Sequence, residues 1–131
     1  MTNVFIMTTN LDFLSLQSRD RAAAKRFYGE LLGFVELPTP NPVATVYKDG
    51  AGAIFAVREP FAPLPDNAQL GLGVGIWFTV PGAVTDWETK LHAAGVPILK
   101  SAYPTPFGTA LTVADPDGYA ITLHETVPAN D

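Results

Sequence analysis

The sequence contains no cysteine, which excludes disulfides, thiolate nucleophiles and zinc–thiolate or iron–sulfur sites. Histidine occurs only twice, at His92 and His124, so a metal site built from three histidines is also excluded. Basic residues are few: 8 stand against 13 acidic ones, for a net charge of −5, and they are scattered along the chain. Such a surface repels a phosphate backbone, so we expect no nucleic-acid partner.

Long hydrophobic runs are missing as well. The longest stretch without charge, residues 67–85, is interrupted by glycines and Pro81, so we expect no membrane span. The first residues lack the basic and apolar regions of a signal peptide, and a cytoplasmic location is the expectation. With 47% hydrophobic residues in a chain of 131, the composition favours one folded domain.

The hydrophobic pattern predicts the same series of elements twice. In each half, an alternating strand precedes an apolar helical stripe that ends at a glycine, Gly33 or Gly95, and three strands follow. Asp20 is the expected N-cap of the first helix. The first series has a strand at 11–17, a helix at 21–32, and strands at 34–37, 44–47 and 53–58. The second has a strand at 74–80, a helix at 83–94, strands at 96–99, 108–113 and 119–124, and a loop at 101–108.

Two pairs of corresponding residues share one offset between the halves. Gly33 and Gly95 lie 62 positions apart, and the same offset places Phe13 on Gly75. Because one such module is too small to bury a sheet face alone, two copies in one unit are expected. We therefore predict an α+β fold of two tandem βαβββ modules in a single domain, 1–131. Module one covers about 11–59, a proline-rich linker covers 60–70, and module two covers about 71–127.

Several short motifs are similar to those of the vicinal oxygen chelate superfamily, which contains glyoxalase I, extradiol dioxygenases, and bleomycin- and fosfomycin-resistance proteins. They are Arg19-Asp20, Ala24, Phe27-Tyr28, Leu31-Leu-Gly-Phe34, Ala93-Ala-Gly-Val96 and Asp115-Pro-Asp-Gly118. The resemblance spans residues 11–125. It implies sheets that curl into a half-barrel cleft, and a homodimer in which modules pair across a two-fold axis.

The resemblance also indicates where metal-dependent members hold a divalent ion. The corresponding positions carry Phe13, Gly75, Thr122 and Ala56, with Ile54 or Arg58 as alternatives to Ala56. Phenylalanine, glycine and alanine have no donor, and a threonine hydroxyl alone cannot hold a divalent ion. We therefore expect no metal and no cofactor, as in metal-less bleomycin-resistance-like members.

Strand alternation separates a helix-covered face from an open face. The open face is expected to carry aromatic and hydroxyl side chains with few titratable groups, a lining that suits a flat or apolar ligand. The loop at 101–108 adds two aromatic residues that could form a lid. The predicted ligand-binding residues are Phe13, Gln17, Arg58, Trp77, Thr79, Tyr103, Phe107, Thr122 and His124.

Each of the more distinctive side chains also has a plainer structural interpretation. Trp77 is either a stacking platform or packs against the facing module, and His124 is either a base or hydrogen-bond donor to ligand or a histidine at the sheet rim. Tyr103 and Phe107 could instead form a subunit contact. His92 is expected in solvent and Trp87 in the core.

Three functions from different classes fit these observations. The first is a drug-binding or antibiotic-resistance protein that binds a small, partly aromatic or apolar molecule in a concave cleft without a metal. The second is a lyase, isomerase or dioxygenase with an unorthodox metal site or with His124 as base. The third is a structural or regulatory partner. The sequence holds no Gly-x-Ser-x-Gly elbow or recognisable triad, so no catalytic residue is assigned.

Overall fold

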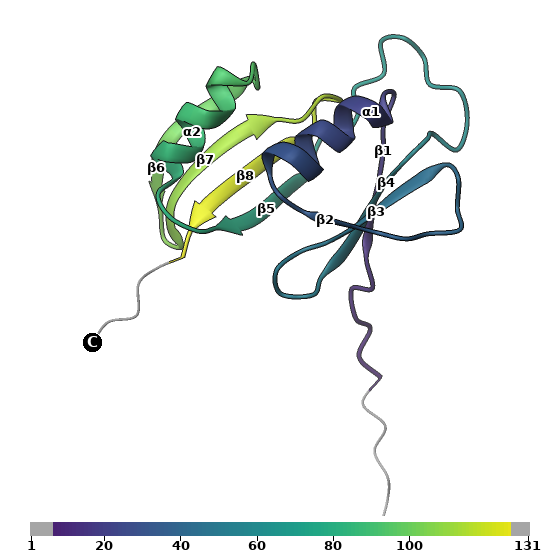
Figure 1. Ribbon diagram of the computed structural model, residues 1–131, viewed down its shortest axis with the longest axis horizontal. Coiled ribbons are helices and arrows are strands. Elements are labelled where there is room, and N and C mark those ends of the chain that lie inside the picture. Colours follow the sequence, from purple (N-terminus) through teal and green to yellow (C-terminus); the bar gives the residue numbers. More distant parts are fainter. Residues whose placement is uncertain (1–6, 127–131) are drawn as a thin grey trace, which may run out of the picture.

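The computed structural model describes residues 7–126 and contains the two expected βαβββ modules (Figure 1). Each module forms its own mixed four-stranded sheet, with strand orders β1-β4-β3-β2 and β5-β8-β7-β6, and the two sheets do not close into a barrel. In each sheet the first strand pairs in parallel with the last strand of its module.

Module one contains β1 (Leu14–Gln17), α1 (Arg21–Ala24), η1 (Lys25–Leu31), β2 (Val35–Leu37), β3 (Ala44–Lys48) and β4 (Ile54–Arg58). Module two contains β5 (Gly75–Val80), α2 (Val84–Ala93), β6 (Ile98–Thr105), β7 (Gly108–Ala114) and β8 (Ala120–Glu125).

The first helix begins and ends where its sequence indicates, but its second half is wider than an α-helix. The Asp20 carboxylate accepts the Ala23 N–H at 3.1 Å, and Gly33 ends the helix with a φ of +81°. Between them η1 is a π-helix, a form that the apolar periodicity does not distinguish from an α-helix. In this wider turn the adjacent rings of Phe27 and Tyr28 are both buried.

The prediction of a loop at 101–108 is wrong. Instead, β6 continues to Thr105 and forms a hairpin with β7. β6 is an edge strand, where the missing N–H of Pro104 is tolerated, and two register shifts absorb the irregular pairing. Tyr103 is therefore a strand residue, and Phe107 lies at the hairpin turn.

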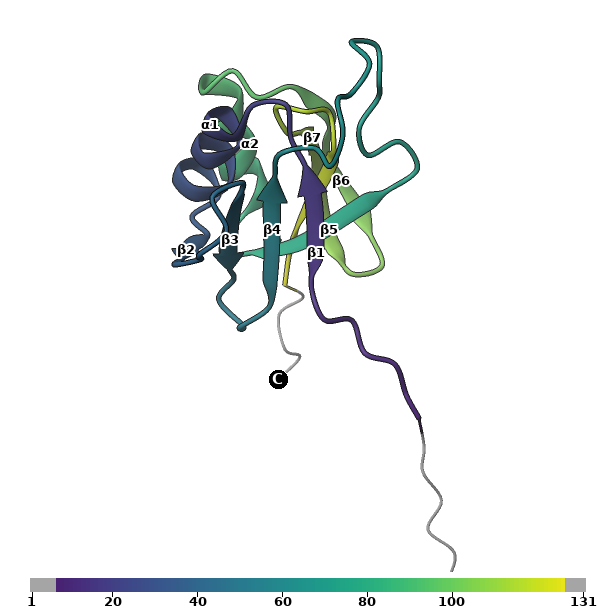
Figure 2. The same cartoon turned by 90° about the vertical axis from the view of Figure 1, so that its right-hand side faces the viewer.

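The helix-facing sides of both sheets share one hydrophobic core. The Phe34 ring contacts Phe55 of the first sheet and Phe78 of the second, with centroid distances of 4.9 and 4.8 Å. The Tyr28 hydroxyl donates to Asp115 Oδ2 at 2.7 Å, which joins the first helix to a turn of module two. Figure 2 shows β3, β4 and β1 of the first sheet side by side. The Lys90 ammonium, in α2, donates to the carbonyl of Leu31, at the end of η1, at 2.7 Å. The two modules are therefore joined by a shared core and by side-chain hydrogen bonds between them.

Residues 59–74, between β4 and β5, form turns and irregular structure. Their course is held from outside by Arg19, whose guanidinium donates to the carbonyl oxygens of Pro65 and Ala68. Within residues 7–126, no helix has both the length and the apolar character needed to cross a bilayer.

Candidate ligand-binding face

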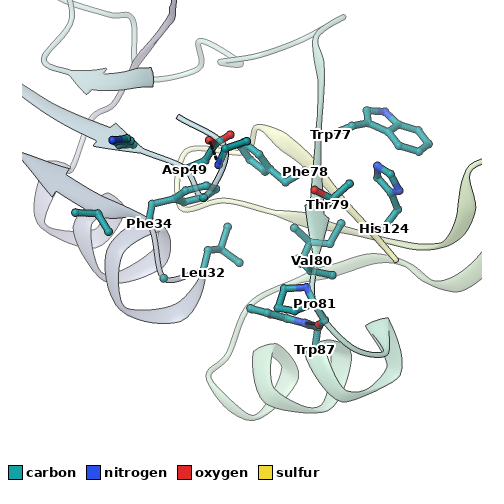
Figure 3. A pocket seen from close by; sticks show the side chains of 16 residues that line it. Leu32, Phe34, Asp49, Trp77, Phe78, Thr79, Val80, Pro81, Trp87 and His124 are labelled. Atoms are coloured by element: carbon teal, nitrogen blue, oxygen red, sulfur yellow. Dashed lines mark hydrogen bonds between the residues drawn. The ribbon is translucent and has the colours of Figure 1, made fainter. Parts of the chain in front are cut away.

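The two faces of each sheet follow the alternation expected from the sequence. Leu16, Val57 and Leu123 are buried in the shared core, whereas Phe13 and Trp77 are 52% and 47% exposed. In Figure 3, Trp77, Thr79 and His124 lie on one side of β5, and Phe34 and Phe78 lie on the other. We name the side of β5–β8 that carries Trp77 the second open face, because it belongs to the sheet of module two. Strand register places these residues on it: Trp77, Thr79, Tyr103, Ala110, Thr112, Thr122 and His124.

Three aromatic rings meet at one end of the second open face. The indole of Trp77 contacts Phe107 edge to face at 6.4 Å and the His124 ring at 5.8 Å between centroids. Phe107, at the hairpin turn, is 64% exposed. A planar molecule could exchange these edge contacts for stacking on the indole. Thr79 lies beside His124 in the strand register.

His124 is oriented by its own backbone neighbour. Its Nδ1 lies 3.1 Å from the Glu125 carbonyl oxygen, and because a carbonyl only accepts, Nδ1 carries the proton in this contact. In the neutral ring Nε2 is then an acceptor. The Glu125 carboxylate points away and accepts the Val84 N–H at 2.9 Å at the start of α2. The two side chains therefore do not act as a dyad, in agreement with the alternation.

A chain of three hydroxyl groups crosses the second open face. The Tyr103 hydroxyl lies 2.9 Å from that of Thr112, which lies 2.9 Å from that of Thr122. Sequence reasoning found Tyr103 and Thr122 but missed Thr112. The signal was available: Thr112 has the same alternation phase as Ala110 in its strand, but its place opposite Thr122 depends on the β7–β8 register.

The predicted residues of module one are arranged differently. Gln17 Oε1 accepts the Phe61 N–H at 3.1 Å, and the Arg58 guanidinium lies 3.8 Å from the centroid of the Phe61 ring. Both side chains therefore hold the segment that follows β4. Phe13 instead lines a groove of about 520 Å³ together with Trp77 and Ile54. The structure thus brings Phe13 toward the Trp77 cluster and leaves Gln17 and Arg58 in contacts with the linker.

A second cavity, of about 620 Å³, surrounds the edge strand β5 (Figure 3). Its lining includes Trp77 and His124 on the open side of β5 and Phe34 on the core side. Trp87 also lines it, partly buried, with its indole N–H donating to the Pro81 carbonyl at 2.9 Å. Because β5 separates the two sides, we assign only the open side to the candidate site.

The positions at which the resemblance implies a metal do not fit one. Phe13, Gly75 and Ala56 offer no side-chain donor, and the Thr122 hydroxyl is bonded to Thr112 and buried. Across residues 7–126 there is no group of three His, Asp or Glu side chains that could hold an ion.

The sequence matches the family model described as Glyoxalase/Bleomycin resistance protein/Dioxygenase superfamily over residues 10–123. The chain belongs to this superfamily. The match agrees with the tandem βαβββ fold and with the resemblance carried by the helix and turn motifs. A search of curated proteins finds no match.

Solved structures similar to this superfamily member include proteins of different kinds. TnmS3, an antibiotic binding protein from Streptomyces sp. CB03234, is 23% identical with a TM-score of 0.70, covering 94% of this chain and 100% of that one. A lactoylglutathione lyase from Agrobacterium tumefaciens is 17% identical with a TM-score of 0.66, covering 90% and 94%. An integron cassette protein from V. cholerae is 20% identical with a TM-score of 0.69, covering 93% and 98%. At these identities the likeness establishes the fold alone.

Proposed function

We propose that this protein binds a small, partly aromatic or apolar molecule on the second open face without a metal ion, as a drug-binding or antibiotic-resistance type of superfamily member. The observation that carries the proposal is the exposed cluster of Trp77, Phe107 and His124 beside the hydroxyl chain. Large exposed aromatic side chains that converge on one face are typical of a binding surface. The antibiotic-binding protein TnmS3 shares the fold, which makes this type of function compatible with it.

Tryptophan fluorescence tests the proposal directly, because the chain has only two tryptophans. In a Trp87→Phe variant, Trp77 is the sole indole, and a set of planar aromatic compounds should include one that quenches its emission saturably. In the matched Trp77→Phe variant, the same compound should leave the emission of Trp87 unchanged. Equal quenching in both variants would place binding elsewhere.

A second candidate function is catalysis by a lyase, isomerase or dioxygenase with His124 as base or with a metal at unorthodox positions. It is supported by the acceptor character of His124 Nε2 on an accessible face, and a lactoylglutathione lyase shares the fold. Elemental analysis of the purified protein separates the metal-dependent form from metal-free binding. Stoichiometric iron, manganese, nickel or zinc would favour the enzyme.

Chelation is expected to leave stability unchanged. An ion bound only by the native state raises its stability by mass action, so removing it would lower the melting temperature. With Phe13, Ala56, Gly75 and Thr122 at the superfamily's ligand positions, we expect no such ion to be bound. Thermal unfolding with and without EDTA measures this, and a fall of several degrees that one specific ion reverses would contradict metal-free binding.

The proposed binder is expected to be a homodimer. The open faces leave Phe13, Trp77 and Phe107 exposed, and soluble monomers seldom expose contiguous apolar patches of this kind. A second copy of the chain is the simplest partner to cover these faces. Sedimentation equilibrium should give twice the chain mass of 14.0 kDa. A monomer at every concentration would contradict the dimer.

A further inference from the structure

The charges on the second open face differ from those of the chain as a whole. The strands β5 to β8 carry two charged side chains, Lys100 and Glu125, and the Glu125 carboxylate is bound at the start of α2 on the other side of the sheet. Besides Lys100, the titratable side chains of these four strands that lie on this face are Tyr103 and His124. In a chain of net charge −5, this face therefore holds a cation and, in these four strands, no carboxylate.

Lys100 lies at the same end of the face as the hydroxyl chain. It pairs with Thr112 in the strand register, and its ammonium lies 4.0 Å from the centroid of the Tyr103 ring. The ion pairs found within residues 7–126 are Arg21–Glu59 and Lys25–Glu36, so Lys100 has no carboxylate partner among them. Two acids of module one line the Trp77 cavities, Asp12 and Asp49, and Asp49 uses Oδ1 to accept the N–H groups of Ala51 and Ala53.

One hydroxyl proton of the chain is available for a hydrogen bond to a ligand. Three hydroxyls supply three protons, and the two bonds between them use two. An anionic acceptor at the Tyr103 end selects the direction in which Thr122 donates to Thr112, Thr112 donates to Tyr103, and Tyr103 donates to the ligand. Donation to an anion strengthens such a chain, because each hydroxyl polarises the next.

Trp77 and Lys100 lie in the same row of the strand register, on opposite edge strands of the sheet. Trp77 on β5 pairs with Thr122 on β8, and Thr122 pairs with Thr112 on β7, so two strand spacings of about 4.8 Å each separate the backbone of Trp77 from that of Thr112. The Tyr103 hydroxyl comes from the opposite edge strand, β6, and lies 2.9 Å from the Thr112 hydroxyl. A flat molecule that stacks on the indole and extends across β8 can therefore reach the Tyr103 hydroxyl.

We propose that the ligand is a planar aromatic acid, whose ring stacks on Trp77 and whose carboxylate or phenolate oxygen accepts from Tyr103 beside Lys100. This inference rests on the proposed binding function and narrows its ligand class. Neutral aromatic molecules would use the indole but would leave the Lys100 charge without a partner.

The test compares two probes of the same shape, 2-naphthoate and 2-naphthamide, with the full chain at pH 7.5. Dissociation constants come from ¹H–¹⁵N NMR titrations that follow the Trp77 indole N–H and the backbone amides of Thr112 and Lys100. We expect 2-naphthoate to bind about tenfold more tightly than 2-naphthamide, since a charge-assisted hydrogen bond is stronger than a neutral one. Both probes should shift the Trp77 signal.

Two variants locate the origin of that preference. Tyr103→Phe keeps the ring and removes the terminal hydroxyl, and Lys100→Met removes the charge; each should reduce the preference for 2-naphthoate to about twofold or less. Two control variants should keep the preference. Thr109→Val is on the same strand as Thr112 but in the opposite alternation phase, and Lys25→Met removes a positive charge from the first helix, at a residue that lines neither Trp77 cavity.

The outcomes separate the two proposals. If both probes bind at Trp77 with equal affinity, or if the control variants lose the preference as Tyr103→Phe does, the acidic ligand class is wrong while the binding function stands. If neither probe shifts the Trp77 signal, the aromatic-acid proposal and the proposed binding face both fail.

Discussion

Trp77→Ala is expected to weaken binding of a planar aromatic ligand by about 1–3 kcal/mol while the fold remains intact. Trp77 is 47% exposed on an edge strand, and its ring contacts are with Phe107 and His124, which are themselves on the open face. Removing the indole therefore takes away ligand contact without opening the core. Fluorescence-independent titration, by calorimetry or NMR, measures the loss of affinity.

Trp87→Ala is the matched control and should behave in the opposite way. Trp87 packs against the shared core, and its indole N–H donates to the Pro81 carbonyl. Because the side chain is partly rather than fully buried, we expect a loss of about 3 kcal/mol of unfolding free energy, at the lower end for tryptophan truncation. Urea denaturation of both variants makes the comparison. An unfolded Trp77→Ala beside an unaffected Trp87→Ala would show that the faces are assigned the wrong way round.

Asp115→Ala is expected to destabilise the protein by at least about 3 kcal/mol. The buried carboxylate accepts the Tyr28 hydroxyl at 2.7 Å and the N–H groups of Asp117 and Tyr119 at 2.9 Å each. Alanine leaves these three donors without an acceptor at the contact between the modules. Chemical denaturation measures the change, and exposed Asp66→Ala serves as the control, with an expected effect within about 0.5 kcal/mol.

The same carboxylate should make stability depend on pH. Burial raises the pKa of Asp115 above its ordinary value, although the hydrogen bond from Tyr28 opposes this. The folded state therefore holds the proton more tightly than the unfolded state. The resulting stabilisation is complete below the unfolded-state pKa of about 3.9 and is lost as the pH rises through the raised folded-state pKa.

Asp115→Asn removes this titration, so a comparison with the wild type isolates the contribution of Asp115 to the pH dependence. The unfolding free energy of the wild type should fall, relative to that of Asp115→Asn, as the pH rises from about 3.5 to 7. Urea denaturation at a series of pH values gives both curves, and an Asp66→Asn variant corrects for the other acids. A constant difference between wild type and Asp115→Asn across this range would be inconsistent with a raised pKa.

The local pattern of the sequence predicted much of the molecule. Asp20 caps the first helix, Gly33 and Gly95 end the two helices in the left-handed region, and the alternation of β1 and β5 assigns Phe13 and Trp77 to the open side. These features depend on residues within a few positions of one another, so their physical basis is present in the sequence itself. The module order and the fold class follow from them.

The loop predicted at 101–108 was wrong, and the helix predicted at 21–32 formed with a wider second half, each for its own reason. Pro104 argues against a strand in isolation, and the strand forms because β7 provides a partner while the edge position makes the missing N–H harmless. In η1 the periodicity of the apolar residues is compatible with both helical forms, and packing of Phe27 and Tyr28 against the sheets accompanies the wider one.

By itself, the sequence determined the two modules and the buried and open faces, because each depends on residue type and short-range periodicity. Residue type also determined that Phe13, Gly75 and Ala56, at positions where the resemblance implies a metal, have no side-chain donor. Tertiary structure decided which open-face residues act together. It joined Tyr103, Thr112 and Thr122 into one hydroxyl chain. It also placed Gln17 and Arg58 in contact with Phe61 of the linker. Strand register between segments distant in the chain sets these contacts, and no local pattern encodes that register.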